Sequence, residues 1–197
     1  MASKPQPQPL DLLIDALRSF HQWLRATKVR GVIIGGAAIA VLGRPRMTRD
    51  VDAVIFSPGV DLKKFVAAGT RFGIVPRIAD VWSFARDSRV LLLRHQPSGL
   101  DLDVSLGALP FEDDMIRHSV TRTIGKTRMR FARPEDLLVM KALAGRDRDW
   151  VDIQGLLEVH DKLDLKHVRQ WLTSFAETLE MPEIVTEFER VVGKRKQ

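Results

Sequence analysis

Apolar residues recur at two different spacings along the chain, and the change of spacing divides it into two parts. Short apolar runs alternate with helical stretches and turn residues at 10–132, whereas apolar residues at 133–197 mostly lie three or four positions apart. Strand side chains have a period of two and helical side chains a period of 3.6 residues. The fold class predicted is α+β, with a mixed sheet flanked by helices at 10–132 followed by a C-terminal helical lobe at 133–197.

The individual elements follow from the same periodicities and from the turn residues between them. We expect an antiparallel hairpin at 89–106 around Gln96-Pro97-Ser98-Gly99, and a second, exposed hairpin at 120–131 around Gly125-Lys126. The other core segments predicted are helices at 10–26, 37–43 and 61–69 and strands at 31–36 and 49–56. In the lobe we expect helices at 134–145, 149–160, 164–180 and 182–193.

Composition narrows the class of protein. The chain has 197 residues, 45% of them hydrophobic and 28% charged, which is ordinary for a soluble globular protein. No apolar run approaches the roughly 18 residues of a membrane span. The absence of cysteine excludes disulfides and thiolate metal sites, and with the lack of a signal sequence in "MASKPQPQP" it favours the cytoplasm. We expect residues 1–9 to form a disordered tail.

The formal net charge of +6 has two interpretations. It suits a polyanionic partner such as RNA, DNA or a nucleotide, and it equally suits a basic surface that keeps the protein in solution. The charge alone does not decide between them.

Two aspartates interrupt an otherwise apolar strand in "RDVDAVIF". On a strand Asp50 and Asp52 project from one face, with Cα atoms about 6.6 Å apart, while Val51 and Ala53 face the other way. Two carboxylates this close repel one another unless a cation lies between them, and Mg²⁺ prefers oxygen ligands together with substrate phosphates. The alternative is an exposed edge strand whose acids pair with Arg46 and Arg49.

A second acidic strand strengthens the metal hypothesis. In "LDLDVSL" Asp101 and Asp103 again share one face while leucine and valine occupy the other. If the two strands are neighbours, three or four carboxylates converge, as two-metal nucleotidyl transfer requires. Gly35 and Gly36, between a strand and a helix, would let backbone amides approach a phosphate, unless they only form a tight turn.

Three segments together resemble a known superfamily. They are "GGAAIAVLGRPRMTRDVDAVI", "LDLDVSLGALPFED" and "PEDLLVMKALAGRDRDWVDIQGLL", and they span most of residues 31–157. Their order and spacing resemble the nucleotidyltransferase superfamily with its polymerase-beta-like fold, and more narrowly the AbiEii/AbiGii-type nucleotidyltransferase toxins. The resemblance implies a nucleotidyltransferase-like mixed sheet.

The resemblance also implies roles for residues of the core. Asp50 and Asp52 would hold Mg²⁺, and Asp103 would be the third metal carboxylate, which helps to deprotonate the acceptor hydroxyl. Asp101 has similar geometry, so the choice of Asp103 rests on the resemblance. Gly35 and Gly36 would cradle the nucleotide phosphates.

Further nucleotide-binding residues are expected before the acidic strand and in the lobe. Arg46 and Thr48 precede the strand, and the resemblance matches Lys141 to a catalytic lysine that meets the triphosphate, assisted by Arg146 and Asp149. A lysine can balance developing phosphate charge. The alternatives are a solvated helix lysine for Lys141, and for Asp149 and Asp152 acids that balance a helix dipole. We expect no role for the five histidines.

The function predicted is that of an Mg²⁺-dependent nucleotidyltransferase, which moves a nucleoside monophosphate from an NTP such as ATP to an acceptor hydroxyl. The resemblance implies a toxin of a toxin–antitoxin pair, with the 3′ end of tRNA as acceptor, an antitoxin protein as partner and no membrane partner. Two alternatives stay open: a non-catalytic nucleotide-binding or antitoxin-like module, and a transferase that modifies a small molecule or a protein hydroxyl. The sequence leaves the base of the NTP and the oligomeric state undecided.

Overall fold

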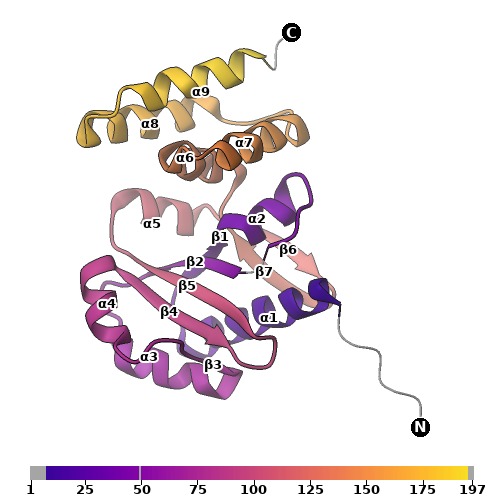
Figure 1. The fold of residues 1–197 in the computed structure, drawn as a ribbon, viewed down its shortest axis with the longest axis vertical. Coiled ribbons are helices and arrows are strands. Elements are labelled where there is room, and N and C mark those ends of the chain that lie inside the picture. Colours follow the sequence, from indigo (N-terminus) through magenta and orange to yellow (C-terminus); the bar gives the residue numbers. More distant parts are fainter. Residues whose placement is uncertain (1–7, 49, 195–197) are drawn as a thin grey trace. The chain divides into compact units, whose positions relative to one another are not determined.

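A seven-stranded mixed sheet carries the acidic strands (Figure 1). The structure is a computed structural model that describes residues 8–48 and 50–194. Its strands are β1 (Gly31–Ile34), β2 (Asp50–Phe56), β3 (Ile74–Pro76), β4 (Val90–His95), β5 (Leu100–Gly107), β6 (Val120–Ile124) and β7 (Thr127–Phe131). The helices are α1 (Pro9–Thr27), α2 (Gly35–Leu42), α3 (Leu62–Gly69), α4 (Val81–Ser88), α5 (Pro110–Arg117), α6 (Pro134–Ala144), α7 (Asp147–Val159), α8 (Leu165–Leu179) and α9 (Glu183–Lys194).

The strand order is β3-β4-β5-β2-β1-β7-β6, with β2 at the centre. β2 pairs in parallel with β5 and antiparallel with β1, and β1 pairs in parallel with β7. Both predicted hairpins, β4–β5 and β6–β7, are antiparallel as expected. The second hairpin is not wholly exposed, because β7 joins the main sheet and buries Met129 and Phe131 completely. The predicted α+β fold class is therefore confirmed.

The described chain separates into two compact units. Of the described residues, one unit contains 8–37, 47–48 and 50–131, and the other contains 38–46 and 132–194. Residues 38–46, expected to belong to the α/β core at 10–132, lie with the helices of the second unit. His160 Nε2 lies 2.6 Å from the carbonyl oxygen of Leu42, and Arg44 forms an ion pair with Glu158.

Helix α1 anchors the sheet of the first unit. Its apolar face buries Leu17, Phe20 and Trp23 almost completely. The Trp23 ring stacks on Phe65 of α3 at 3.9 Å between centroids, and its Nε1 donates to the Phe65 carbonyl at 2.9 Å. Buried aromatic rings with a satisfied polar group contribute strongly to stability. The sheet thus rests on a fixed layer formed by α1 and α3.

One strand and two α-helices of the first unit were not predicted. β3 has only three residues and ends at Pro76, and α4 and α5 have eight residues each. The helix predicted at 37–43 begins earlier, at Gly35. Of the tail expected at 1–9, residues 1–7 lie outside the described part, and Pro9 already begins α1.

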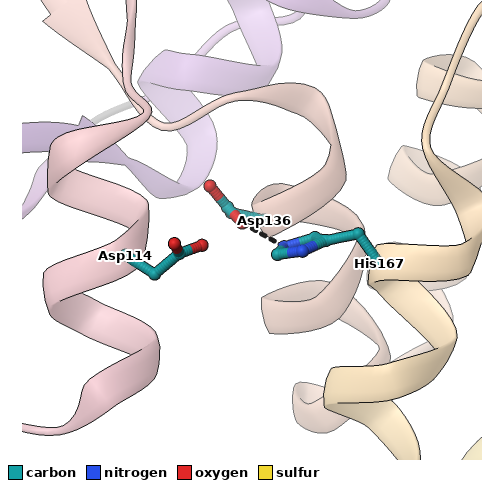
Figure 2. Close-up of side chains that lie close together, drawn as sticks. All are labelled: Asp114, Asp136 and His167. Atoms are coloured by element: carbon teal, nitrogen blue, oxygen red, sulfur yellow. Dashed lines mark hydrogen bonds and ion pairs between the residues drawn. The ribbon is translucent and has the colours of Figure 1, made fainter.

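The four helices predicted for the lobe are all present in the second unit, as α6 to α9. Asp136 of α6 is fully buried and accepts from Arg133 Nε at 2.9 Å, while His167 Nε2 of α8 lies 3.2 Å from its other oxygen (Figure 2). Burial raises the pKa of Asp136, and Arg133 and His167 partly offset that rise. His167, for which no role was expected, thus ties α8 to α6.

No helix in the described residues combines the length and the apolar character that crossing a membrane requires.

Candidate functional site

The pairing of β2 with β5 brings the four aspartates of the two acidic strands together. The parallel register sets Asp50 opposite Asp101 and Asp52 opposite Asp103. Directly paired residues of neighbouring strands point to the same face, and the strands lie about 4.8 Å apart. The predicted neighbourhood of the two strands is therefore confirmed, and a compact acidic patch lies on one face of the sheet centre.

The opposite face of these strands is buried. Val51, Ala53, Leu102 and Val104 are all fully inaccessible to solvent. Of the aspartates, Asp50 is exposed and the other three are partly buried. The apolar face fixes the strands against the core, so the carboxylates are held at the surface of a rigid layer.

Two arginines neutralise the β5 side of this acidic patch. Arg77 Nη1 lies 2.8 Å from Asp103 Oδ1 and 3.2 Å from Asp101 Oδ2, and Arg94 Nε donates to Asp101 Oδ1 at 2.8 Å. Asp101 therefore has two cationic partners, whereas within 8–48 and 50–194 Arg77 is the one arginine placed against Asp103. This difference separates two residues that sequence geometry left equivalent.

Sequence reasoning missed both arginines. Arg94 had a usable signal, because the predicted hairpin pairs it directly with Asp101. Arg77 had none, since it follows the short strand β3, which the periodicity did not reveal.

Gly35 lies against the carboxylate of Asp52. A Cβ atom at Gly35 would be 2.0 Å from Asp52 Oδ2, and the residue has a φ of +59°. The lack of space excludes any larger residue at this position, and glycine adopts the left-handed backbone conformation at little cost. Because α2 begins at Gly35, its first amides and the positive end of its dipole lie beside Asp52.

The residues before β2 divide between the two units. The hydroxyl of Thr48 donates to Asp50 Oδ1 at 2.6 Å, so Thr48 belongs to the acidic patch. Arg46 instead pairs with Asp152 of α7, at 3.0 Å from Nε to Oδ1 and 3.1 Å from Nη2 to Oδ2. The alternative in which Arg46 pairs with the strand acids is therefore wrong, and Arg49 lies outside the described residues.

Lys141 occupies a buried ionic cluster in the second unit. It is 8% exposed, and its Nζ lies 2.6 Å from Asp149 Oδ1 and 2.9 Å from Asp152 Oδ2. Arg146 Nε donates to Asp149 Oδ2 at 2.6 Å. The alternative of a solvated helix lysine is wrong, because two helices, α6 and α7, enclose the ammonium group.

Asp149 serves two structural purposes at once. Besides its ion pairs, its Oδ2 accepts from the backbone amide of Arg146 at 3.3 Å, as an acid at a helix N-terminus does. Burial works to raise the pKa of Asp149, but hydrogen bonds from Arg146 and Lys141, together with their charges, bring the pKa below its ordinary value. Asp149 is therefore a carboxylate at neutral pH.

The predicted site residues thus form two groups, one in each unit. Gly35, Gly36, Thr48 and the aspartates of β2 and β5 belong to the first unit. Arg46, Lys141, Arg146 and Asp149 belong to the second.

This arrangement, a glycine-led helix beside paired carboxylates, agrees with a match to one protein family. The family described as "Nucleotidyl transferase AbiEii toxin, Type IV TA system" matches residues 25–194. The chain belongs to the AbiEii nucleotidyl transferase toxin family. It is accordingly a nucleotidyltransferase enzyme of a toxin–antitoxin family, and its acidic patch suits the divalent metal that such enzymes typically use.

Solved structures show the same fold at low sequence identity. The solution structure of the antibiotic-resistance factor ANT(2'')-Ia is 13% identical with a TM-score of 0.60, covering 89% of this AbiEii-family chain and 97% of its own. The lincosamide antibiotic adenylyltransferase LnuA is 16% identical with a TM-score of 0.52, covering 80% and 100%. JHP933 from Helicobacter pylori is 17% identical with a TM-score of 0.52, covering 96% and 82%.

No curated protein sequence matches the chain.

Proposed function

We propose that this chain is an Mg²⁺-dependent toxin that transfers a nucleoside monophosphate from an NTP to the 3′-terminal hydroxyl of tRNA, with release of pyrophosphate. The observation that carries the proposal is the register of β2 and β5, which sets Asp103 beside Asp52, the aspartate that lies against Gly35 at the start of α2. Family membership supports the transfer reaction, and the geometry of the acidic patch supports the proposed metal and the roles proposed for its aspartates.

The carboxylates fit a hard divalent cation. Asp50, Asp52 and Asp103 offer oxygen ligands from one face of two adjacent strands, without a sulfur or nitrogen ligand among them. When bound, the metal activates the acceptor oxygen and offsets charge on the phosphates. Asp101 contributes less in this account, because Arg94 and Arg77 already balance its charge.

Other residues of the patch bind and orient the substrates. The amides of Gly35 and Gly36 bind the phosphates from the N-terminus of α2, where an anion is favoured. Thr48 fixes the rotamer of Asp50 through its hydrogen bond. Asp103 accepts the proton of the acceptor hydroxyl, and the hydroxyl oxygen must therefore bind within hydrogen-bond distance of this carboxylate.

Two cations of the second unit, Lys141 and Arg146, are part of the proposal. Lys141 is the residue proposed to contact the triphosphate, with Asp149 and Asp152 holding its ammonium in a single orientation. Arg146 belongs to the same cluster and remains mostly exposed, with 74% of its side-chain surface accessible, so its guanidinium can reach a phosphate. The toxin family further implies an antitoxin partner, which would restrain transfer in the cell.

The test is a transfer assay with each of the four α-labelled NTPs, purified tRNA and total cell extract. We expect one NTP to label the 3′ end of tRNA, and Asp50→Ala and Asp52→Ala variants to leave it unlabelled. Full activity of both variants would contradict the assigned site. Labelling of a protein band instead of tRNA would retain the site and replace the acceptor.

A small-molecule hydroxyl is the second candidate acceptor. LnuA is a lincosamide antibiotic adenylyltransferase and ANT(2'')-Ia an antibiotic-resistance factor, and both have the same fold. If label appears on an added lincosamide or aminoglycoside and not on tRNA, this second acceptor class replaces the first.

A further inference from the structure

A basic hollow of about 560 Å³ lies in the first unit, between α1 and the β6–β7 hairpin. Its cationic lining residues are Arg25 from α1, Lys126 from the hairpin turn, and Arg128 and Arg130 from β7. The rest of its lining consists of His21, Gln22 and two threonines. Every lining side chain can donate a hydrogen bond or carry positive charge, and none of them is apolar or acidic.

Most arginines elsewhere on the described surface have partners within the chain. Arg94, Arg117 and Arg169, for example, each form an ion pair with a neighbouring carboxylate. Among the residues that the structure describes, neither Arg25, Lys126 nor Arg128 has such a carboxylate partner. Three exposed cations that converge without an internal acid repel one another, which costs stability unless an external anion binds.

Two further observations show that the hollow is positive and partly preformed. The pKa of His21 is lowered by burial, and next by the charges of Arg25 and Arg130, so the imidazole is neutral in a positive surrounding. Arg130 is held in place because its Nε donates to Ser119 Oγ at 2.8 Å and its Nη2 to the Ile116 carbonyl at 2.5 Å. An anion that enters the hollow therefore meets a guanidinium already oriented.

The lining chemistry distinguishes a nucleic-acid backbone from a protein partner. Contacts to phosphates come from arginine, lysine, threonine and glutamine side chains, which are the residue types found here. Protein–protein interfaces instead have an apolar and aromatic centre depleted in lysine. β7 is separated from the acidic strand β2 by β1 alone, so these two strands lie roughly 10 Å apart across the sheet.

We propose that the basic hollow binds the phosphate backbone of the RNA acceptor at a distance from the acidic patch. This inference rests on the proposed function for the choice of RNA, and it adds the surface that holds the acceptor. The hollow supplies backbone contacts and therefore affinity for RNA, whereas selection of the terminal hydroxyl belongs to the acidic patch.

The test measures binding without catalysis, by fluorescence anisotropy of labelled tRNA with the full chain and no NTP. The double variant Arg25→Gln/Lys126→Gln is compared with Lys63→Gln/Arg86→Gln, which removes the same charges from exposed positions on α3 and α4. We expect the first variant to bind tRNA roughly tenfold more weakly in moderate salt, and its slope of log K against log salt to fall by about 1.5. The tRNA affinity of the second variant should stay within about twofold of that of the native chain. The tenfold loss follows from the removal of two phosphate contacts and not from the change in net charge.

Several outcomes decide the matter. Equal tRNA affinity of the two variants would overturn the proposal. It would also be overturned if poly-L-glutamate bound as tightly as tRNA and if Arg25→Gln/Lys126→Gln weakened both to the same extent. An Arg25→Lys/Arg128→Lys variant should keep the salt slope, since a lysine neutralises a phosphate as an arginine does. If tRNA binds through the hollow but receives no label, the hollow stands and the proposed acceptor reaction fails.

Discussion

Gly35 and Asp52 are in such close approach that any side chain at position 35 would meet the Asp52 carboxylate, since a Cβ there would lie 2.0 Å from Oδ2. The conformation of the glycine at the start of α2 and that of the aspartate of β2 therefore depend on each other, although 16 residues lie between them in the sequence. Glycine at position 35 is therefore required by the contact with Asp52 as well as by the proposed approach of a phosphate.

The first prediction concerns Gly35→Ala. The added methyl group would displace the Asp52 carboxylate by roughly an ångström, which can lower transfer on the order of 100-fold. Gly59→Ala is the matched control, because Gly59 has a φ of +78° but nothing within 4 Å of an added Cβ. Both variants should lose about 1 kcal/mol of unfolding free energy from left-handed strain, while only Gly35→Ala loses transfer. Equal activity of the two variants would show that the contact with Asp52 is unimportant.

The second prediction separates Asp103 from Asp101. Asp103→Asn should reduce transfer by roughly 1,000-fold, because it removes both a metal ligand and the proton acceptor. Asp101→Asn should keep activity within about tenfold of the native chain, since its charge is already matched by Arg94 and Arg77. Initial rates of label transfer test this, and the reverse order of the two effects would exchange their roles.

The third prediction concerns Arg77. Its guanidinium lies 2.8 Å from Asp103 Oδ1 and therefore competes with a metal cation for that carboxylate. Arg77→Gln should bind Mn²⁺ several-fold more tightly in calorimetric titration of the chain with metal alone. Arg94→Gln is the control, because Arg94 pairs with Asp101 and not with Asp103. Weaker metal binding by Arg77→Gln than by Arg94→Gln would mean that Arg77 orients the carboxylate for the metal.

The fourth prediction concerns Lys141 as a structural residue. Lys141→Met leaves Asp149 and Asp152 buried without their shared ammonium group, and should lower the free energy of unfolding on the order of 3 kcal/mol. Lys166→Met, at an exposed position of α8, should change it by less than about 0.5 kcal/mol. Chemical denaturation of both variants tests this. A similar stability of the two would show that the buried cluster contributes little to folding.

Much of the fold was predictable, because alternation and turn residues are local signals. The acidic strands, both hairpins and the four C-terminal helices follow from spacing alone. The contacts between residues far apart in the sequence could not be predicted in this way. Arg77 approaches Asp103 through a three-residue strand without a periodic pattern, and Arg46 pairs with Asp152 from more than 100 positions away.

The burial of Lys141 shows the same limit within the helices. Its segment is apolar on nearly every side, so no polar face marks it as exposed or buried, and its partners come from the next helix. The family resemblance selected Lys141 for its chemistry, while the structure adds that it is held by two carboxylates.

The fifth prediction concerns pH. The pKa of Asp149 is lower than its ordinary value, because the effects of Arg146 and Lys141 outweigh the effect of burial. A carboxyl whose pKa is lower in the folded than in the unfolded chain stabilises folding above its unfolded value of about 3.9, and this contribution is lost as the pH falls further. The Tm difference between the native chain and Asp149→Asn should therefore be largest near neutral pH and shrink below about pH 4.

Asp87→Asn provides the control for this pH series, because Asp87 is exposed on α4. Its Tm difference from the native chain should stay small at every pH. A difference for Asp149→Asn that grows on acidification would contradict the assigned direction of the shift.

The central claim is that the carboxylates of β2 and β5 are a metal platform for nucleotidyl transfer. Its most direct measurement is transfer of α-labelled nucleotide to tRNA by the native chain and by Asp52→Asn, first with EDTA and then over a titration with Mg²⁺. The account predicts no transfer with EDTA, saturable recovery of the native chain with Mg²⁺, and no recovery of Asp52→Asn at the same concentrations. Transfer that persists in EDTA, or an Asp52→Asn variant that recovers as the native chain does, would contradict it.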